Sequence, residues 1–467
     1  MHPARSGRRA ACLAVLLACA LPAQAEQAPA PPVAPNVQEA PLPPPVELPA
    51  PDSRPDDVPD RPLTAAEAAA IALRYHANVT AAQAGVVGAQ ARVRQAQAAL
   101  RPTAGIGAGY TRSDRVVSGG GSGGSGGSGS SSPGYSASAT LRQLLFDRQH
   151  SRDLVRQAAA QERGATESLS RVEADLVLQV KQAFYTYLQN TRLVAVNEAN
   201  LRSRREHLAL AEARLKAGVG LPLDVVRAKT AVSEAVLALT TARNNASTAR
   251  VSLAALMGLD PRTPIQVAES SEPEVKEEDV NALIESALKQ RPEVRQAEAA
   301  VEASRYAVSA ARTTNAPALS ASAGLSSRGA DLSGIGTSVT LGLQLQWTPF
   351  DGGVAAGRMA EAQAGAETAE AQLRNIQQQV VAEVSQAYLN LRTAEQRVAT
   401  AEDGIANAEE SLRLASGRYR AGVGIFLDVL DAQAALLTAQ TTHINAVAAV
   451  AQARAALSRA LGAPVRP

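Results

Sequence analysis

Two stretches of the sequence share the motif AGVGxxLDV: RLKAGVGLPLDVVRAKTAVSEA at residues 214–235 and RYRAGVGIFLDVLDAQAALLTA at residues 418–439. They lie 204 positions apart, and each stands between two long alanine-rich segments. Glycine adopts the left-handed backbone that ends many helices, and an aspartate such as Asp224 or Asp428 favours the first turn of a helix. We therefore predict that each motif forms the tight tip of a long helical hairpin.

The duplication reaches well beyond these motifs. Gly258 matches Gly462 at the same spacing of 204, whereas Ala72 matches Ala287 at a spacing of 215. The first half therefore holds 11 additional residues, and a Gly/Ser-rich run at residues 119–134 accounts for them. A flexible insertion at one place indicates an exposed loop tip. A phosphate-binding loop is the alternative, but no Lys-Ser or Lys-Thr pair follows the run and no βαβ pattern surrounds it.

Apolar residues of the second half recur in steps of four and three from Val380 to Tyr419. This period of 3.5 residues is that of a coiled-coil seam. We expect one helix from about residue 351 to 419, roughly 100 Å long, and a second from about 427 to 461. The equivalent seam of the first half, Leu176 to Leu215, is interrupted by three polar residues: Asn190, Asn197 and Arg204.

A different pattern marks residues 338–348, where apolar residues such as Val339 and Leu341 alternate with small or polar ones. A period of two predicts a strand with one apolar and one polar face. Residues 135–146 are the counterpart in the first half. Each half thus contributes one β-hairpin with strands about ten residues long, a length that crosses a bilayer when tilted. Aromatic side chains collect at membrane interfaces, and we expect this of Phe146, Trp347 and Phe350.

Four membrane strands cannot stand alone, because lipid leaves the backbone groups of an open sheet edge without hydrogen-bond partners. The smallest common barrel has eight strands, so the chain must assemble with copies of itself. Two copies give eight strands and a lumen filled by side chains, whereas three give twelve strands and room for a passage. The predicted fold is mainly α with a membrane β-barrel portion: long antiparallel coiled-coil helical hairpins plus two β-hairpins per subunit, in duplicate.

The N-terminus has the pattern of a secretory signal peptide: three arginines, the apolar run AACLAVLLACAL and an AxA cleavage site that ends at Ala25. A lipoprotein cleavage site before Cys19 is the alternative, in which Cys19 is acylated. The two cysteines of the chain are Cys12 and Cys19, so a chain cut after Ala25 has no thiol. No later segment has about 18 uninterrupted apolar residues, the minimum for a membrane-spanning helix.

Composition divides the chain into six parts. Residues 26–62 are proline-rich, which favours an extended linker, and acidic residues cluster at 272–279 between the halves. The expected parts are a signal peptide (1–25), a Pro-rich flexible linker (26–62), a first structural repeat (63–261), an acidic connector (262–281), a second structural repeat (282–463) and a tail (464–467).

Catalytic and metal chemistry have no candidate residues in the sequence. The five histidines are not spaced with one another or with carboxylates as a metal site needs, and no Ser/His/Asp arrangement can be nominated. The formal net charge of +2 provides no strong field for nucleic acid. We therefore expect no enzyme activity, no cofactor, no metal and no nucleic-acid partner.

In combination these features resemble the TolC family of outer-membrane efflux proteins. The likeness covers roughly residues 63–463, and its most specific motif is RYRAGVGIFLDVLDA at residues 418–432. The resemblance implies a homotrimer in which a twelve-stranded barrel in the lipid of the outer membrane joins a long α-helical periplasmic tunnel. It implies export of drugs, metals or proteins by tripartite efflux or type I secretion. The implied partners are a periplasmic adaptor (membrane fusion) protein and an inner-membrane pump or ABC transporter.

The resemblance also assigns roles to the hairpin tips. In the family, rings of aspartates close the periplasmic entrance, and the matching residues here are Asp428 and Asp431. A tyrosine before the second turn and an aspartate after the first tie neighbouring hairpins together, which corresponds to Tyr419 and Asp224. The family's docking site for the adaptor corresponds to the turn residues Gly218, Val219, Gly422 and Val423.

Two positions depart from the family pattern. Gly424 stands where the family type member has an arginine that strengthens the closed state, and Leu223 replaces a threonine. The resemblance therefore predicts a closed state that is held by fewer bonds, or by other ones.

Simpler roles for the same residues stay open. Asp224 and Asp428 are also helix N-terminal charges, and Tyr419 continues the seam, so packing alone can explain it. The counterpart of Asp431 is Arg227, which indicates a role peculiar to one hairpin. For the whole chain the alternative function is a trimeric coiled-coil tether, anchored in the envelope and without transport. The polar strand face argues against the tether, because an anchor needs no wet lumen.

Overall fold

The computed structural model describes residues 61–113, 132–269, 279–329 and 336–462. Outside the described residues lie the predicted signal peptide with Cys19, nearly all of the Pro-rich segment, most of the Gly/Ser-rich run and the centre of the acidic connector. The described part includes almost all of both predicted repeats.

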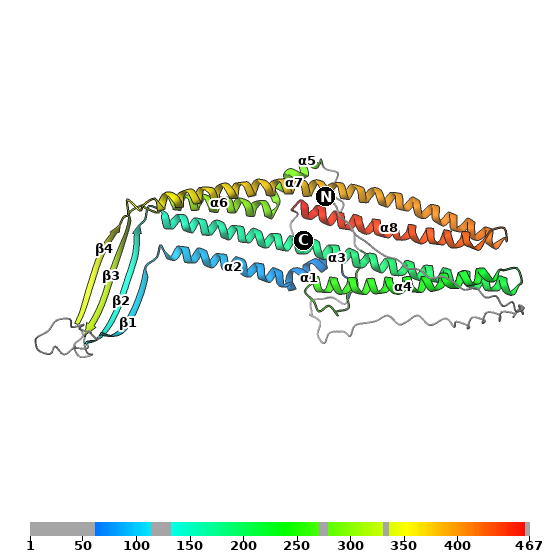
Figure 1. Ribbon diagram of the computed structural model, residues 1–467, viewed down its shortest axis with the longest axis horizontal. Coiled ribbons are helices and arrows are strands. Elements are labelled where there is room, and N and C mark those ends of the chain that lie inside the picture. Colours follow the sequence, from blue (N-terminus) through cyan, green and yellow to red (C-terminus); the bar gives the residue numbers. More distant parts are fainter. Residues whose placement is uncertain (1–60, 114–131, 270–278, 330–335, 463–467) are drawn as a thin grey trace, which may run out of the picture. The chain divides into compact units, whose positions relative to one another are not determined.

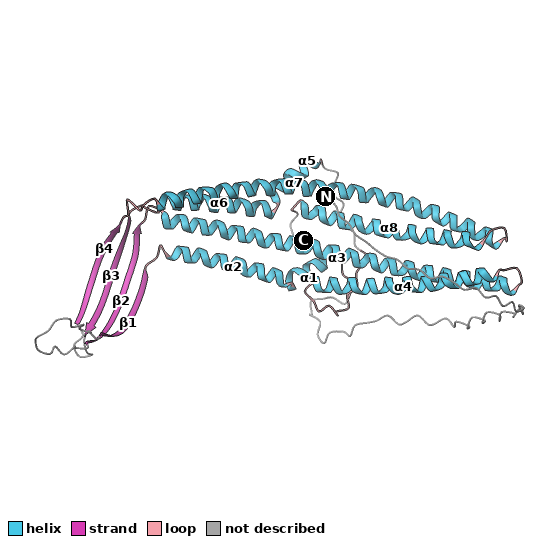
Figure 2. Cartoon of the chain, in the orientation of Figure 1, coloured by secondary structure: helices cyan, strands magenta, loops and turns pink. Residues whose placement is uncertain are grey.

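Each repeat has the same order of elements: two short helices, a β-hairpin, one very long helix and a shorter helix that returns along it (Figures 1 and 2). The first repeat consists of α1 (Ala65–Tyr75), α2 (Ala77–Ala98), β1 (Thr103–Ser113), β2 (Ser132–Phe146), α3 (His150–Lys216) and α4 (Pro222–Leu256). The second consists of α5 (Val280–Gln290), α6 (Pro292–Arg312), β3 (Ala318–Gly329), β4 (Gly336–Gln346), α7 (Val354–Arg420) and α8 (Phe426–Ala460).

The helix bounds follow the two spacings of the sequence. α3 and α7 each have 67 residues and begin 204 positions apart, and α4 and α8 each have 35 residues at the same spacing. α1 and α5 each have 11 residues and begin 215 positions apart. The predicted helical hairpins and strands are confirmed, and the helices of the second hairpin begin and end close to the expected residues.

The long helices pack through the predicted seam. Every seam position of α7 from Val380 to Tyr419 is buried or half-buried, and the α3 seam becomes exposed only at Leu215, its last position. α3 packs against α1, α2, α4, α6 and α8, whereas α7 packs against α5, α6 and α8. The 3.5-residue pattern did not predict that Phe184 and Tyr185 are buried. Both belong to a cluster in which α1 covers a second side of α3.

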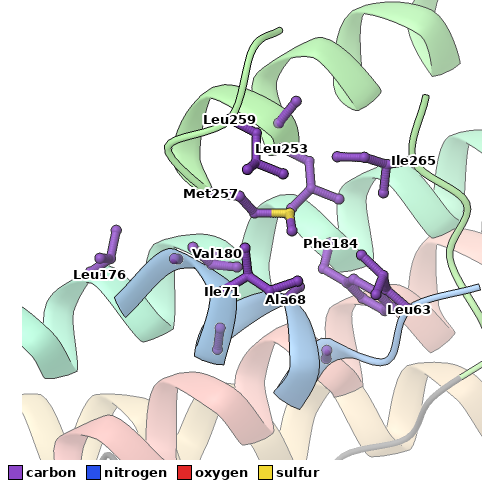
Figure 3. Packing of buried hydrophobic residues seen from close by; sticks show 14 of the residues in the cluster. Leu63, Ala68, Ile71, Leu176, Val180, Phe184, Leu253, Met257, Leu259 and Ile265 are labelled. Carbon is purple, nitrogen blue, oxygen red and sulfur yellow. The ribbon is translucent and has the colours of Figure 1, made fainter. Parts of the chain in front are cut away.

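The largest cluster of buried side chains lies where α1, α3 and the end of α4 meet (Figure 3). Phe184 has no exposed surface there. The residues that share this cluster include Leu63, Ala68, Ile71, Val180, Leu253, Met257, Leu259 and Ile265. Leu63 also forms an isolated parallel bridge with Val267. The first residues of the predicted connector therefore pack into the core of the first repeat.

The four strands form one antiparallel sheet in the order β1-β2-β3-β4. One row of directly opposed residues is Ile106, Ala139, Leu325 and Val339, and the adjacent row is Gly105, Thr140, Gly324 and Thr340. Residues directly opposite each other share a face, and successive rows alternate between the two faces. One face of the sheet is therefore apolar, and the other carries glycine and hydroxyl groups. β1 and β4 are the two edges, and every residue of β4 is exposed.

Short connections join this sheet to the helices. Residues 99–102 lead from α2 into β1, and residues 147–149 lead from β2 into α3. The turns of the helical hairpins, residues 217–221 and 421–425, follow the opposite ends of α3 and α7. None of the described helices is both long enough and apolar enough to span a membrane.

Candidate functional site

Both helical hairpins turn through the same hydrogen-bonded motif. The amides of Gly218 and Val219 donate to carbonyls in the last turn of α3 at 3.0 and 3.1 Å, and Gly422 and Val423 repeat both bonds at the end of α7. The first glycine of each AGVG has a positive φ, 76° at Gly218 and 78° at Gly422. Glycine takes this left-handed conformation without steric cost. The motif thus ends both helices with their last carbonyls bonded.

The second glycine of each motif packs against the helix that it follows. A Cβ atom on Gly220 would lie 2.6 Å from the amide nitrogen of Leu215, and one on Gly424 would lie 2.9 Å from Cβ of Arg418. These separations are too short for carbon contacts, so any side chain at residue 424 displaces the turn. The tightness of the turn therefore favours glycine at residue 424.

Tyr419 joins the two hairpins. Its side chain is 4% exposed, its ring packs on Phe426, and the guanidinium of Arg214 lies 4.7 Å above the ring centre. The hydroxyl donates to Oδ2 of Asp224 over 3.5 Å, and Nη1 of Arg214 donates to the carbonyl of Tyr419 at 2.8 Å. Two residues of the first hairpin therefore hold one residue of the second.

The predicted pair Tyr419 and Asp224 is thus brought together, and Arg214 and Phe426 complete the contact. The sequence patterns predicted neither Arg214 nor Phe426 as part of this contact. Arg214 opens the duplicated stretch and has Arg418 as its counterpart, so the duplication alone gives no reason to prefer one arginine. The difference comes from the three-dimensional contact, in which only Arg214 reaches the tyrosine ring.

Burial raises the pKa of the Tyr419 phenol, and the negative charge of Asp224 raises it further. The phenol therefore keeps its proton at neutral pH and acts as the hydrogen-bond donor, with the carboxylate as acceptor. The link between the hairpins is consequently present throughout the physiological pH range.

Asp428 and Asp431 lie in the first turns of α8, and both are exposed. They are three positions apart in the sequence, so they stand about one turn apart on the same side of the helix. In the described part of the chain neither carboxylate forms an ion pair. The structure does not bring them to Tyr419 or Asp224, and their side chains are available to groups outside the chain.

The turns themselves present apolar side chains to solvent. Val219 is 68% exposed and Val423 is 72% exposed, and the neighbouring Leu221 and Ile425 are exposed as well. Exposed apolar residues at a tight, rigid turn are typical of a contact surface. The aromatic residues predicted at the membrane interface are also exposed, at the connections between sheet and helices: Phe146, Trp347 and Phe350.

A second group of charged residues, absent from the sequence-based predictions, joins the two repeats midway along the long helices. Arg459 of α8 pairs with Asp175 of α3 and Glu293 of α6, and Arg291 pairs with Glu293 and with Glu383 of α7. The Arg291 side chain is only 2% exposed. Because these residues come from four helices and the α5–α6 connection, no spacing along the sequence predicts the cluster. We call these five residues the ionic junction.

No group of three or more His, Cys, Asp or Glu residues in the described segments is arranged to hold a metal ion. What the hairpin tips offer is instead a set of rigid turns, a buried link between hairpins and exposed carboxylates.

The sequence is similar to known proteins over both repeats. The family model described as "Outer membrane efflux protein" matches residues 69–259 and 283–463. The chain is 27% identical over 326 residues to outer membrane efflux protein BepC of Brucella suis, which covers 69% of this chain and 71% of BepC. It is also 27% identical over 263 residues to protein CyaE of Bordetella pertussis, or 55% of this chain and 56% of CyaE.

Among solved structures, the fold is similar to that of the Campylobacter jejuni CmeC outer membrane channel. The TM-score is 0.75 at 16% sequence identity, and the match covers 85% of each chain. At this identity the likeness concerns the fold. Each of the two matched regions covers nearly all of one half of the duplication.

Proposed function

This chain belongs to the outer membrane efflux protein family, the TolC family, and we propose that three copies of it form one continuous channel-tunnel. In this proposal the sheets of the three copies close into a twelve-stranded barrel through the outer membrane. The hairpins α3–α4 and α7–α8 continue the barrel as a helical tube across the periplasm. The family consists of channels, not enzymes, so the protein conducts its cargo without changing it.

The observation that carries the proposal is the sheet. It has an apolar face, a face of glycine and hydroxyl residues, and two edges, β1 and β4, at which the ladder stops. In water such an apolar face is unfavourable, and in lipid open edges are unfavourable. Both costs disappear when β4 of one copy pairs with β1 of the next and the apolar face meets lipid. The polar face then lines a wet lumen.

The copy number follows from the strand number. Two copies give eight strands, which side chains fill, whereas three give twelve strands with room for a passage. The helices agree with this assembly, because the first-repeat helix α3 is covered on several sides by its own chain and α7 packs against fewer elements. The remaining surface of the second hairpin is available to a neighbouring copy.

We propose that the hairpin tips form the periplasmic entrance. Asp428 and Asp431 are exposed and form no ion pair with the other described residues of one chain, and in a trimer each supplies three like charges around one axis. Such a ring attracts cations and resists crowding. Tyr419 and Asp224 act beside it by holding the two hairpins of each copy together.

We propose further that a periplasmic adaptor binds the turns and that an inner-membrane pump or ABC transporter delivers the cargo. The support is the exposed, apolar and rigid surface of the two turns, with Val219 and Val423 at its centre. The glycines Gly218 and Gly422 fix the backbone beneath them. Tripartite efflux and type I secretion both fit this arrangement, and the cargo is chosen by the inner-membrane partner.

The channel proposal is tested in planar lipid bilayers. The purified protein should conduct ions, and the double variant Asp428→Ala with Asp431→Ala should lower the preference for cations over anions. A matched control is Glu409→Ala, which removes an exposed acid from α7 more than one helical turn before the tip. If the double variant conducts ions with unchanged selectivity, the two aspartates do not form the gate. If the wild-type protein conducts no ions, it is not a channel.

The docking proposal is tested separately, in cells. Val219→Asp with Val423→Asp places charges on the turns without touching the barrel or the gate. We expect normal insertion in the outer membrane, loss of export and loss of adaptor crosslinks to the turns. The paired control Val219→Ile with Val423→Ile keeps the surface apolar and should export normally. Full export by the aspartate variant would exclude the turns as the docking site.

A further inference from the structure

Arg227 and Asp431 occupy the same place in the two hairpins. α4 and α8 have equal lengths and begin at matched positions, and residues 227 and 431 are 204 positions apart. The same helix face is buried in both: Val225 corresponds to the buried Val429, and Ala228 corresponds to the buried Ala432. The side chains at 227 and 431 therefore leave their helices in equivalent directions, at the same distance from the turn. One is a cation and the other an anion.

Neither side chain has a charged partner among the residues that the structure describes. Both are exposed, and no ion pair among the described residues involves Arg227 or Asp431. On α8 the residue one turn before Asp431 is Asp428, so two like charges stand together and nothing in the described chain compensates them. On α4 the equivalent residue is Asp224, which accepts a hydrogen bond from Tyr419. The two hairpin tips are therefore alike in backbone and opposite in charge at residues 227 and 431.

The link that joins the two hairpins within one chain has no counterpart between copies. The position that matches Tyr419 in the first hairpin is Leu215, which is exposed where the tyrosine is buried. If the hairpins alternate around an axis, the contact between copies sets this leucine opposite Asp428, and leucine cannot donate a hydrogen bond. Gly424 adds no side chain there. The tips of neighbouring copies must be held by other groups.

We infer that Arg227 and Asp431 alternate around the periplasmic entrance, each arginine pairing with the aspartate of the next copy. This inference rests on the trimeric channel proposed above. In that ring three guanidinium groups separate three carboxylates, so the constriction is closed by attraction between copies and its negative charge is reduced. The neighbouring ring of Asp428 keeps the entrance attractive to cations. Because the pairs are exposed, added salt weakens them; screening acts over about 10 Å at 0.1 M salt.

Disulfide trapping tests the proximity of the two residues. Arg227→Cys with Asp431→Cys is made in the full chain, whose two cysteines, Cys12 and Cys19, lie near the N-terminus. We expect oxidation to link chains covalently into dimers and trimers that separate on reduction. Each single-cysteine variant is the control and should give no such ladder. Absence of covalent oligomers from the double variant, in protein that still forms the native trimer, would overturn the inference.

Charge exchange tests the function of the pair. Arg227→Glu should raise cation selectivity several-fold and increase the fraction of time the channel is open, because it replaces attraction between copies with repulsion. Arg227→Asp with Asp431→Arg restores the alternating ring and should return both quantities to wild-type values. If Arg227→Glu leaves selectivity and opening unchanged while Asp428→Ala with Asp431→Ala alters them, the pairing of Arg227 with Asp431 is refuted. The assignment of the two aspartates to the gate then still holds. If the wild-type protein forms no channel, the proposed function itself fails.

Discussion

In both repeats a short helix breaks at a matched residue, His76 in the first and Arg291 in the second, and the end of the returning helix lies against the break. Gly258 and Gly462 make these approaches possible, since a Cβ at either would crowd the backbone beside the break. The surroundings differ. Both breaks border an apolar cluster, around Phe184 in the first repeat and around Val384 in the second, and the second break also carries the ionic junction.

The two repeats share a backbone arrangement, but the contacts of their side chains differ. The two long helices and the two returning helices have equal lengths in both repeats, and both hairpin turns form the same pair of bonds from the glycine and valine amides. Side chains at matched positions differ wherever their neighbours differ. At the break the partner of α3 is α1, and the partner of α7 is α5 with charged residues from α3 and α8. Paired substitutions at matched positions therefore measure what each repeat has specialised for.

The largest difference is expected at Phe184 and its counterpart Tyr388. Phe184 is fully buried, so Phe184→Ala should lower the free energy of unfolding by about 3–5 kcal/mol through lost burial and an unfilled cavity. Tyr388→Ala should lower it by less than half as much, because Tyr388 is only half-buried. Denaturant unfolding in detergent, followed by far-UV circular dichroism, measures both. Equal effects would contradict the asymmetry between the two cores.

The ionic junction gives the next largest effect. Arg459→Met leaves Asp175 and Glu293 without their shared cation, and the arginine is 17% exposed. We expect a loss of about 2–3 kcal/mol, below the ~3–5 kcal/mol of a fully buried pair. Arg413→Met, which breaks an exposed pair with Glu410, is the control and should cost less than ~1 kcal/mol.

The double variant Arg459→Met with Asp175→Asn separates charge from packing at the junction. It removes the carboxylate that the single variant leaves without its arginine, whereas Glu293 keeps its pair with Arg291, so it should recover much of the lost stability. A double variant less stable than Arg459→Met would mean that the Asp175 carboxylate serves the fold without the arginine.

Two glycines near the hairpin tips should respond with opposite signs. Gly220→Ala places a Cβ 2.6 Å from the Leu215 amide nitrogen and should lower the unfolding free energy by about 1–3 kcal/mol through overpacking. Gly417→Ala, in the last turn of α7 with open space around it, should raise it by about 0.5–1 kcal/mol through helix propensity. Thermal unfolding in detergent distinguishes the signs, and a stabilising Gly220→Ala would refute the tight-turn account.

A smaller effect on stability is expected at the two turns that lead from a strand into a long helix. Gln149 has φ 72°, and its counterpart Gly353 has φ 97°. A left-handed backbone costs a residue with a side chain about 1–2 kcal/mol. We expect Gln149→Gly to stabilise the protein by up to about 1 kcal/mol and Gly353→Ala to destabilise it by a similar amount, both read from the unfolding midpoint. Destabilisation by Gln149→Gly would show that the glutamine side chain makes a contact worth more than the strain.

The smallest effect is expected at Tyr419. Tyr419→Phe keeps the ring and removes a long hydrogen bond to Asp224, which should cost about 0.5–1 kcal/mol. The pKa of this phenol is raised in the folded chain, by burial and then by Asp224, so the protonated form is the one favoured by folding. Its contribution is complete below the unfolded pKa of about 10 and is lost as the pH rises through the folded value.

The wild-type protein should therefore lose stability relative to Tyr419→Phe only above about pH 10. Leu215→Tyr at the matched position is the sharper comparison. It places a tyrosine in the first hairpin, where the Asp428 carboxylate of a neighbouring copy would accept its hydrogen bond. A gain in trimer stability is expected, measured as resistance to dissociation in detergent.

Much of the fold could be predicted because its signals are local and repeated. The 3.5-residue seam from Val380 to Tyr419 and the two AGVG turns define the helical hairpins, and the alternation around Val339 defines a strand. The pair Tyr419 and Asp224 was also identified in advance, from the family likeness of the motif. The ionic junction was not, because its residues come from helices far apart in sequence and lie among many other charged residues. The burial of Phe184 and Tyr185 was not predicted, because a heptad pattern describes one packed side of a helix and α3 has more than one packed side.

One chain cannot close its own four-stranded sheet in lipid, and we propose that three copies close it together. Native mass spectrometry of protein extracted from the outer membrane in mild detergent measures the number of copies. We predict a single assembly with three times the mass of the mature chain, stable without any other protein. A uniform population of single chains that retain their β-structure would exclude this assembly.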